Sequence, residues 1–103
     1  MYIPDRGDFI DLSLPSSTPS EPIKKRFALV ISAQKFNQIS SLAFVCPITT
    51  KVKGFPFEVK LPDQLSQVYG VVLIHHLRSI DWREREVEYI ETAPKDVMEE
   101  VIA

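Results

Sequence analysis

Short strand-like segments, separated by connections rich in proline, glycine or serine, restrict the possible folds of this chain most. In the first of them, Ile10, Leu12 and Leu14 alternate with polar neighbours, as in a half-buried strand. Further strands are predicted at residues 27–31, 42–48, 57–61, 70–74 and 86–91. Segments of this length and spacing are typical of a small, strongly bent sheet or barrel. We therefore predict a mainly β protein.

Helices are predicted in only two places. Residues 33–37 can form one short helical turn. Thr92 can cap a second helix that begins near Pro94, because proline is tolerated in the first helical turn. The side chains expected on one face of that helix are Val97, Met98, Val101 and Ile102. Residues 15–22 and 62–67 are predicted to be loops, and a long loop in so small a domain is often functional.

The length of 103 residues predicts a single domain over residues 1–103. No apolar run approaches the roughly 20 residues of a membrane span, and the N-terminus lacks the apolar region of a signal peptide. The single cysteine, Cys46, lies in an apolar run and is expected in the core. Because the sequence has no spacing typical of zinc ligands, we expect no metal and no other cofactor. These features favour the cytoplasm.

Charge is distributed unevenly, although the net charge is only −2. Residues 1–60 carry 8 Lys/Arg and 5 Asp/Glu, a net charge of +3, whereas residues 61–103 carry 4 against 9, a net charge of −5. An overall acidic protein with a basic half can still hold a local site for an anionic ligand.

Two polar clusters lie beside predicted strands and suggest what that ligand is. Arg26 leads directly into the apolar strand that begins at Phe27, and Thr49 follows the strand at residues 42–48. An arginine fork and a hydroxyl together bind phosphate well. The sequence therefore points to a nucleic-acid backbone as the target.

Several motifs, in this order and spacing, resemble the MazF/PemK family of toxin endoribonucleases from bacterial toxin–antitoxin pairs. The resemblance covers about residues 2–102. The motifs that carry it are Pro4-Asp5-Arg6-Gly7-Asp8, Ser20-Glu21 before Arg26, Pro47-Ile48-Thr49-Thr50, Lys53-Gly54-Phe55-Pro56-Phe57-Glu58-Val59, Gly70-Val71-Val72 and Arg78-Ser79-Ile80-Asp81.

The resemblance implies an SH3-like barrel with a short C-terminal helix, which forms a homodimer with RNA bound across the interface. Members of the family cut single-stranded RNA at short sequences without a metal, leaving a 2′,3′-cyclic phosphate and a 5′-hydroxyl, and the disordered tail of an antitoxin blocks their groove. Arg26 and Thr49 match the catalytic arginine and threonine, and Glu21 matches an acidic loop residue. The alternatives are a non-enzymatic gyrase-binding toxin of the same fold and an inactive barrel that binds RNA or a peptide.

The chain departs from the family most clearly at His75-His76, where many members have Asp-Gln. On a strand these two side chains would face opposite sides, and His75 is the candidate for proton transfer. We expect Phe55 to stack on bases and Phe57 to pack in the core, while Trp82 belongs to the core or to a dimer interface. The residues expected to contact RNA are Lys24, Lys25, Thr50, Lys51, Lys53, Phe55, His76 and Arg78.

Overall fold

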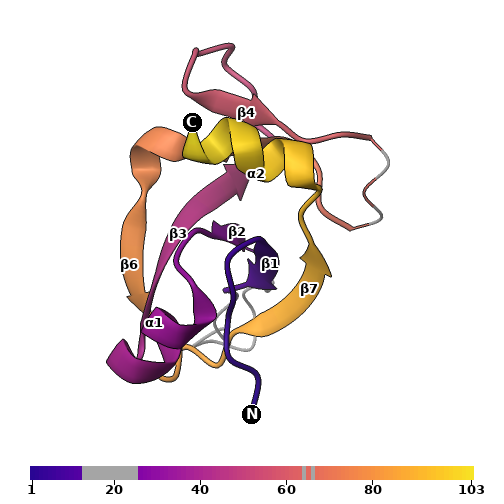
Figure 1. The fold of residues 1–103 in the computed structure, drawn as a ribbon. Helices are drawn as coiled ribbons and strands as arrows, with labels where there is room; N and C mark the ends of the chain where they lie inside the picture. The colour runs from indigo at the N-terminus through magenta and orange to yellow at the C-terminus, as the bar shows by residue number, and fades with distance from the viewer. Residues whose placement is uncertain (13–25, 64, 66) are drawn as a thin grey trace.

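The computed structural model describes residues 1–12, 26–63, 65 and 67–103. These residues form a mainly β structure with two short helices and one 3-10 turn (Figure 1). The strands are β1 (Asp8–Asp11), β2 (Phe27–Val30), β3 (Leu42–Thr49), β4 (Glu58–Lys60), β5 (Val71–Leu73), β6 (Arg78–Asp81) and β7 (Glu88–Thr92). The helices are α1 (Gln34–Ser40) and α2 (Lys95–Ile102), and the 3-10 turn η1 spans Ile74–His76.

The seven strands form one antiparallel sheet, in which six follow the order β4-β5-β3-β2-β1-β7 and β6 pairs with β3 outside this order. The long strand β3 organises this sheet, because β6 pairs with its first half, β5 with its end and β2 with its middle. The predicted mainly β fold with a short C-terminal helix is confirmed. The described strands form an open, bent sheet, however, since β4 and β7 stay at opposite ends of the paired order.

Apolar side chains fill both faces of the central strands. Phe9, Leu29 and Cys46 belong to one buried cluster, which Val97 and Val101 of α2 cover. Their strand neighbours point to the other face and form a second cluster, made of Ile10, Leu12, Ala28, Val30, Ala43, Val45, Ile80 and Trp82. Burial on both faces explains why β2 reads as a continuous apolar run. It also confirms the core position predicted for Cys46 and assigns Trp82 to the core.

Helix α2 begins without the predicted cap. Thr92 ends β7, where its hydroxyl lies 2.7 Å from the hydroxyl of Tyr89, and no side chain caps the helix at Pro94. Val97 and Val101 are buried as predicted, whereas Ile102 is 55% exposed. No helix among the described residues is long and apolar enough to cross a membrane.

Helix α1 is held against the sheet by a buried asparagine. The Nδ2 atom of Asn37 donates hydrogen bonds to the carbonyl oxygens of Pro4 at 2.8 Å and Ser32 at 3.0 Å. The indole of Trp82 donates to the carbonyl oxygen of Asn37 at 2.9 Å. Because a buried amide needs such partners, this network fixes the helix, which is seven residues long rather than the single turn predicted.

Candidate active site

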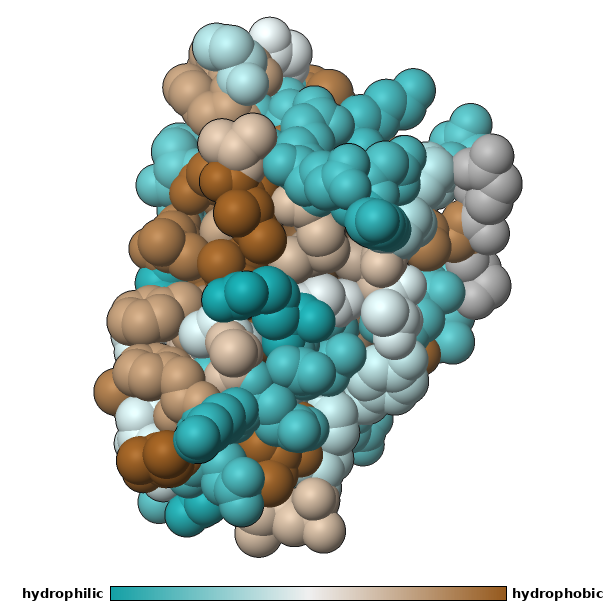
Figure 2. Space-filling view, in the orientation of Figure 1, coloured by the Kyte–Doolittle hydropathy of each residue, from teal (hydrophilic) through white to brown (hydrophobic). Residues whose placement is uncertain are grey.

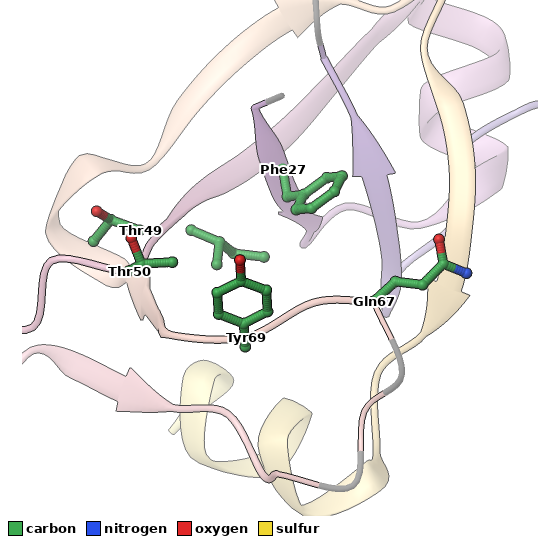
Figure 3. Close-up of a pocket in the computed structure, with 6 residues that line it drawn as sticks. Phe27, Thr49, Thr50, Gln67 and Tyr69 are labelled. Carbon is green, nitrogen blue, oxygen red and sulfur yellow. The ribbon is translucent and has the colours of Figure 1, made fainter. Parts of the chain in front are cut away.

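A pocket of about 520 Å³ opens where the end of β3 meets the start of β2 and the connection into β5. Its lining consists of Phe27, Ile48, Thr49, Thr50, Gln67 and Tyr69. In Figure 3 the two threonines come from the end of β3, and the Tyr69 ring extends into the space between them and Phe27. Three hydroxyls and one amide therefore surround a partly apolar floor, and none of the described lining residues is a carboxylate.

Thr49 is positioned by strand pairing and by a local turn. It lies opposite Val71 of β5, and its Oγ1 atom accepts a hydrogen bond from the backbone N–H of Lys51 at 3.1 Å. A hydroxyl that accepts one bond keeps its own proton for donation. Thr49 can thus donate a hydrogen bond to an anionic oxygen in the pocket.

Arg26 directly precedes β2 and is followed by the pocket residue Phe27. The pairing of β2 with β3 begins at Ala28 and Pro47, two residues after Arg26 and two residues before Thr49, so both residues belong to the same end of this strand pair. The carbonyl oxygen of Arg26 accepts a hydrogen bond from the backbone N–H of Leu12 at 2.7 Å, which fixes the start of β2.

Three predicted site residues, Glu21, Lys24 and Lys25, lie outside the described residues. Phe27, which follows these residues closely in the sequence, is part of the pocket lining. Their proposed roles therefore rest on the sequence.

The connection from β3 to β4 carries Thr50, Lys51, Lys53 and Phe55, all of them exposed. Glu58 shapes this connection, because its carboxylate accepts hydrogen bonds from the backbone N–H groups of Lys53 at 3.2 Å and Gly54 at 2.9 Å. Thr50 lines the pocket itself. The two lysines add positive charge next to the pocket.

His75 and His76 lie in the 3-10 turn η1, not on a strand as predicted. Their rings do not face opposite sides of a sheet but lie side by side, with centroids 4.1 Å apart. The tighter turn changes the direction of successive side chains, whereas a strand alternates them. The prediction of opposite faces was wrong for this reason.

Phe57 was predicted to be in the core, but its side chain is 37% exposed. Its ring centroid lies 5.1 Å from that of Phe55 and 3.9 Å from that of His75. Four rings from two chain segments therefore form a continuous row. We call Phe55, Phe57, His75 and His76 the aromatic row.

The environment of His75 lowers its pKa below the usual value near 6.5. Partial desolvation among the neighbouring rings contributes most, followed by the charge of His76. Glu58 opposes this shift, and Lys53 adds to it. His75 is therefore mostly neutral at pH 7, the form in which an imidazole can accept a proton.

Arg78 is exposed at the start of β6, opposite Val45 of β3. Val45 precedes Thr49 by four residues along the same strand. The distance along β3 from the level of Arg78 to Thr49 in the pocket is thus on the order of 10 Å. In the sequence, Arg78 follows the turn η1 by two residues.

Sequence reasoning did not identify Tyr69, Gln67 and Phe27 as pocket residues. Phe27 was treated only as a strand residue, because its pattern is that of a buried strand. Tyr69 is 70% exposed directly before Gly70 and β5. An aromatic residue with a hydroxyl at the entry to a buried strand was the available signal.

Among the described residues, no three histidine, cysteine, aspartate or glutamate side chains are grouped closely enough to hold a metal ion.

Comparison with known proteins then identifies the family. The profile of the PemK-like, MazF-like toxins of type II toxin-antitoxin systems matches residues 5–103. The chain belongs to this family. The Escherichia coli K12 endoribonuclease toxin MazF is 38% identical over 84 residues, which are 82% of this chain and 74% of the relative. The endoribonuclease toxin ChpB of the same strain is 33% identical over 102 residues, covering 95% and 87%.

Solved structures of family members agree with this assignment. A MazE-MazF crystal structure from Deinococcus radiodurans matches with a TM-score of 0.85 at 44% identity, covering 98% of this chain and 90% of the other. A crystal structure of MazF from the same organism matches with a TM-score of 0.84 at 43% identity, covering 99% and 92%. The family resemblance seen in the sequence motifs is therefore confirmed.

Proposed function

We propose that this protein is the toxin of a type II toxin–antitoxin pair and an endoribonuclease that cuts single-stranded RNA. The pocket lined by Thr49 and by Phe27, the residue that follows Arg26, is the observation that carries this proposal. The similarity to the Escherichia coli endoribonuclease toxins MazF and ChpB supports it. A guanidinium and a hydroxyl at the same end of a strand pair can together bind the oxygens of one phosphate.

The proposed reaction is an internal transfer at the phosphate. The 2′-oxygen of the ribose attacks phosphorus, the bond from phosphorus to the 5′-oxygen breaks, and a 2′,3′-cyclic phosphate and a 5′-hydroxyl result. The proton of the 2′-hydroxyl passes to a base, and the departing 5′-oxygen receives a proton. Arg26 and Thr49 stabilise the charge on the phosphoryl oxygens in the transition state. No step requires a metal ion in this proposal.

Two groups are proposed for the proton transfers. Glu21 is the carboxylate candidate, close to Arg26 in the chain. His75 is the imidazole candidate, and its lowered pKa suits a base. Val71 pairs with Thr49, and His75 follows Val71 by four residues. Within one subunit, the distance along the chain from Val71 to His75 is therefore on the order of 10 Å. Movement of the RNA or a second subunit must therefore close this gap if His75 transfers the proton.

A homodimer is part of the proposal, and an exposed apolar surface supports it. Apolar side chains gather along one edge of the molecule, on the side where Figure 1 shows β6 and α1 (Figure 2). The exposed apolar residues of α1, of β3 and of the connection between η1 and β6 are Phe36, Ile39, Leu42, Phe44 and Leu77. The rings of Phe36 and Phe44 stack with centroids 5.6 Å apart. A surface of this kind suits a two-fold interface, where the same patch meets itself.

The proposed partners are single-stranded RNA and a MazE-like antitoxin, the latter supported by the MazE-MazF structures of Deinococcus radiodurans. The proposed place of action is the cytoplasm, where messenger RNA is available.

Incubation of the purified protein with a mixed-sequence RNA in EDTA tests this function. We expect cuts at a short recurring sequence, with a 2′,3′-cyclic phosphate and a 5′-hydroxyl at the new ends. Intact RNA under these conditions, and also after addition of Mg²⁺, would favour the non-enzymatic alternatives of the same fold.

A further inference from the structure

The aromatic row is an exposed surface that the proposed chemistry at Arg26 and Thr49 does not use. Phe55 and Phe57 are 47% and 37% exposed, and both histidines are exposed as well. Ring centroids follow one another at 5.1, 3.9 and 4.1 Å. Aromatic side chains of a small domain normally contribute to its core. Four consecutive rings at the surface therefore need another explanation.

The row is also held in place by the backbone. The Glu58 carboxylate fixes the connection that carries Phe55, through its bonds to the N–H groups of Lys53 and Gly54. The backbone N–H of Ile74 donates to the carbonyl oxygen of Phe57 at 3.3 Å, which joins the two segments of the row. A prearranged surface loses little conformational entropy when a ligand binds.

Charge indicates what kind of ligand fits. Lys53 lies near enough to His75 to influence its titration, and Lys51 is exposed on the same connection. Glu58 is the acidic group in this environment of His75, and its two carboxylate oxygens already accept backbone hydrogen bonds. Aromatic rings beside cations are the usual platform for the bases and phosphates of single-stranded nucleic acid.

We propose that Phe55, Phe57 and His75 form a stacking subsite for a base of the RNA that does not flank the bond being cut, which leaves Glu21 and not His75 as the group for the proton transfer. This inference rests on the proposed function and adds a second contact region to it. Phe57 joins Ile74 through its backbone, and Ile74 lies three residues beyond Val71, the partner of Thr49. The subsite is thus on the order of 10 Å from the level of Thr49, whereas stacked bases are about 3.4 Å apart along one strand.

Fluorescence of 2-aminopurine reports the stacking directly. A set of RNAs carries this base at successive positions around the cleavage sequence, with a 2′-O-methyl group at the cut site so that the attacking hydroxyl is absent. We expect strong quenching at one position at least two nucleotides from the cut, lost in Phe57→Leu and retained in Phe57→Trp. Quenching that is absent, confined to the two bases at the cut, or unchanged in Phe57→Leu overturns the proposal.

Binding of the same RNAs, measured by fluorescence anisotropy, gives the second readout. Loss of one stacked base corresponds to about 1–3 kcal/mol, so Phe57→Leu should weaken binding roughly tenfold or more. Tyr89→Leu is the matched control, because Tyr89 is 47% exposed on the edge strand β7. Melting curves establish that each variant is folded. Equal affinity of Phe57→Leu and the parent protein overturns the subsite and leaves the row available to a protein partner.

Cleavage of unmodified RNA by the parent protein is measured in parallel, which separates two failures. If the parent protein cuts RNA and Phe57→Leu binds normally, only the stacking subsite is wrong. If the parent protein neither cuts nor binds RNA, the proposed function fails together with the subsite.

Discussion

Gly70 lies directly against the backbone of Thr49. A Cβ atom at Gly70 would overlap the carbonyl oxygen of Thr49 and lie 2.9 Å from its carbonyl carbon. Gly70 also has a φ of +110°, a conformation that other residues adopt only with strain. Since Thr49 lines the pocket, this contact ties the shape of the candidate site to the start of β5.

Replacing Gly70 with alanine should therefore impair both stability and cleavage. We expect Gly70→Ala to lower the free energy of unfolding by about 2–4 kcal/mol, from backbone strain and overpacking together, and to shift Thr49 in the pocket. Denaturant unfolding and RNA cleavage at a temperature where the variant is folded measure the two effects.

Gly54→Ala is the matched control for this variant. Gly54 has a φ of +79°, but among the described residues no atom beyond its two chain neighbours lies within 4 Å of a Cβ atom placed there. It should lose only about 1–2 kcal/mol, from backbone strain alone. Equal effects of the two substitutions would show that close approach to Thr49 is unimportant.

The titration of His75 should follow its surroundings. Its pKa in the folded protein is lowered, so its NMR titration midpoint should lie below 6.5. His76→Gln should raise this midpoint, because a neighbouring positive charge is removed. Glu58→Gln should lower it further, because a stabilising negative charge is lost. A midpoint above 6.5 in the parent protein, or shifts of the opposite sign, would contradict the described arrangement.

The thiol of Cys46 should be unreactive in the folded protein. Burial raises the pKa of this thiol and leaves its side chain only 1% exposed, and the thiolate is the reactive form. A colorimetric thiol reagent at pH 8 should therefore react slowly with the native protein and quickly in denaturant. Fast reaction without denaturant would place Cys46 outside the core.

The apolar edge of the molecule should mediate dimerisation. Ile39 is 76% exposed on α1, and a charge there would be desolvated in an interface. Light scattering should give twice the subunit mass of 11.8 kDa for the parent protein and a single subunit mass for Ile39→Glu.

Tyr89→Glu, on the edge strand β7, provides the matched control for the dimer and should leave the mass unchanged. A monomeric parent protein at micromolar concentration would contradict the proposed dimer.

Much of the sheet could be predicted because its strands carry their own signal. The apolar run of β2 indicated a strand buried on both faces, and Ala28 and Leu29 do lie in opposite core clusters. The open form of the sheet could not be predicted in this way, because pairing between distant strands leaves no local pattern.

Local pattern also failed where a tertiary contact decides the conformation. The strand predicted to continue toward His75 ends at Leu73, and the chain enters a 3-10 turn whose rings pack on Phe57. Phe57 itself looked like a core residue, because hydrophobicity does not say which apolar residues are left exposed. Tyr69 joined the pocket only through the fold of the connection before β5.

Cleavage by Arg26→Ala tests the central claim most directly. The parent protein, Arg26→Ala and Lys95→Ala are compared on the same RNA in EDTA, with circular dichroism and melting curves to establish folding. Lys95 is an exposed cation on α2, outside the site, and serves as the matched loss of charge. We predict that Arg26→Ala lowers the cleavage rate at least about 100-fold, while Lys95→Ala cuts like the parent protein. Cleavage by a folded Arg26→Ala protein at nearly the parent rate would contradict the account.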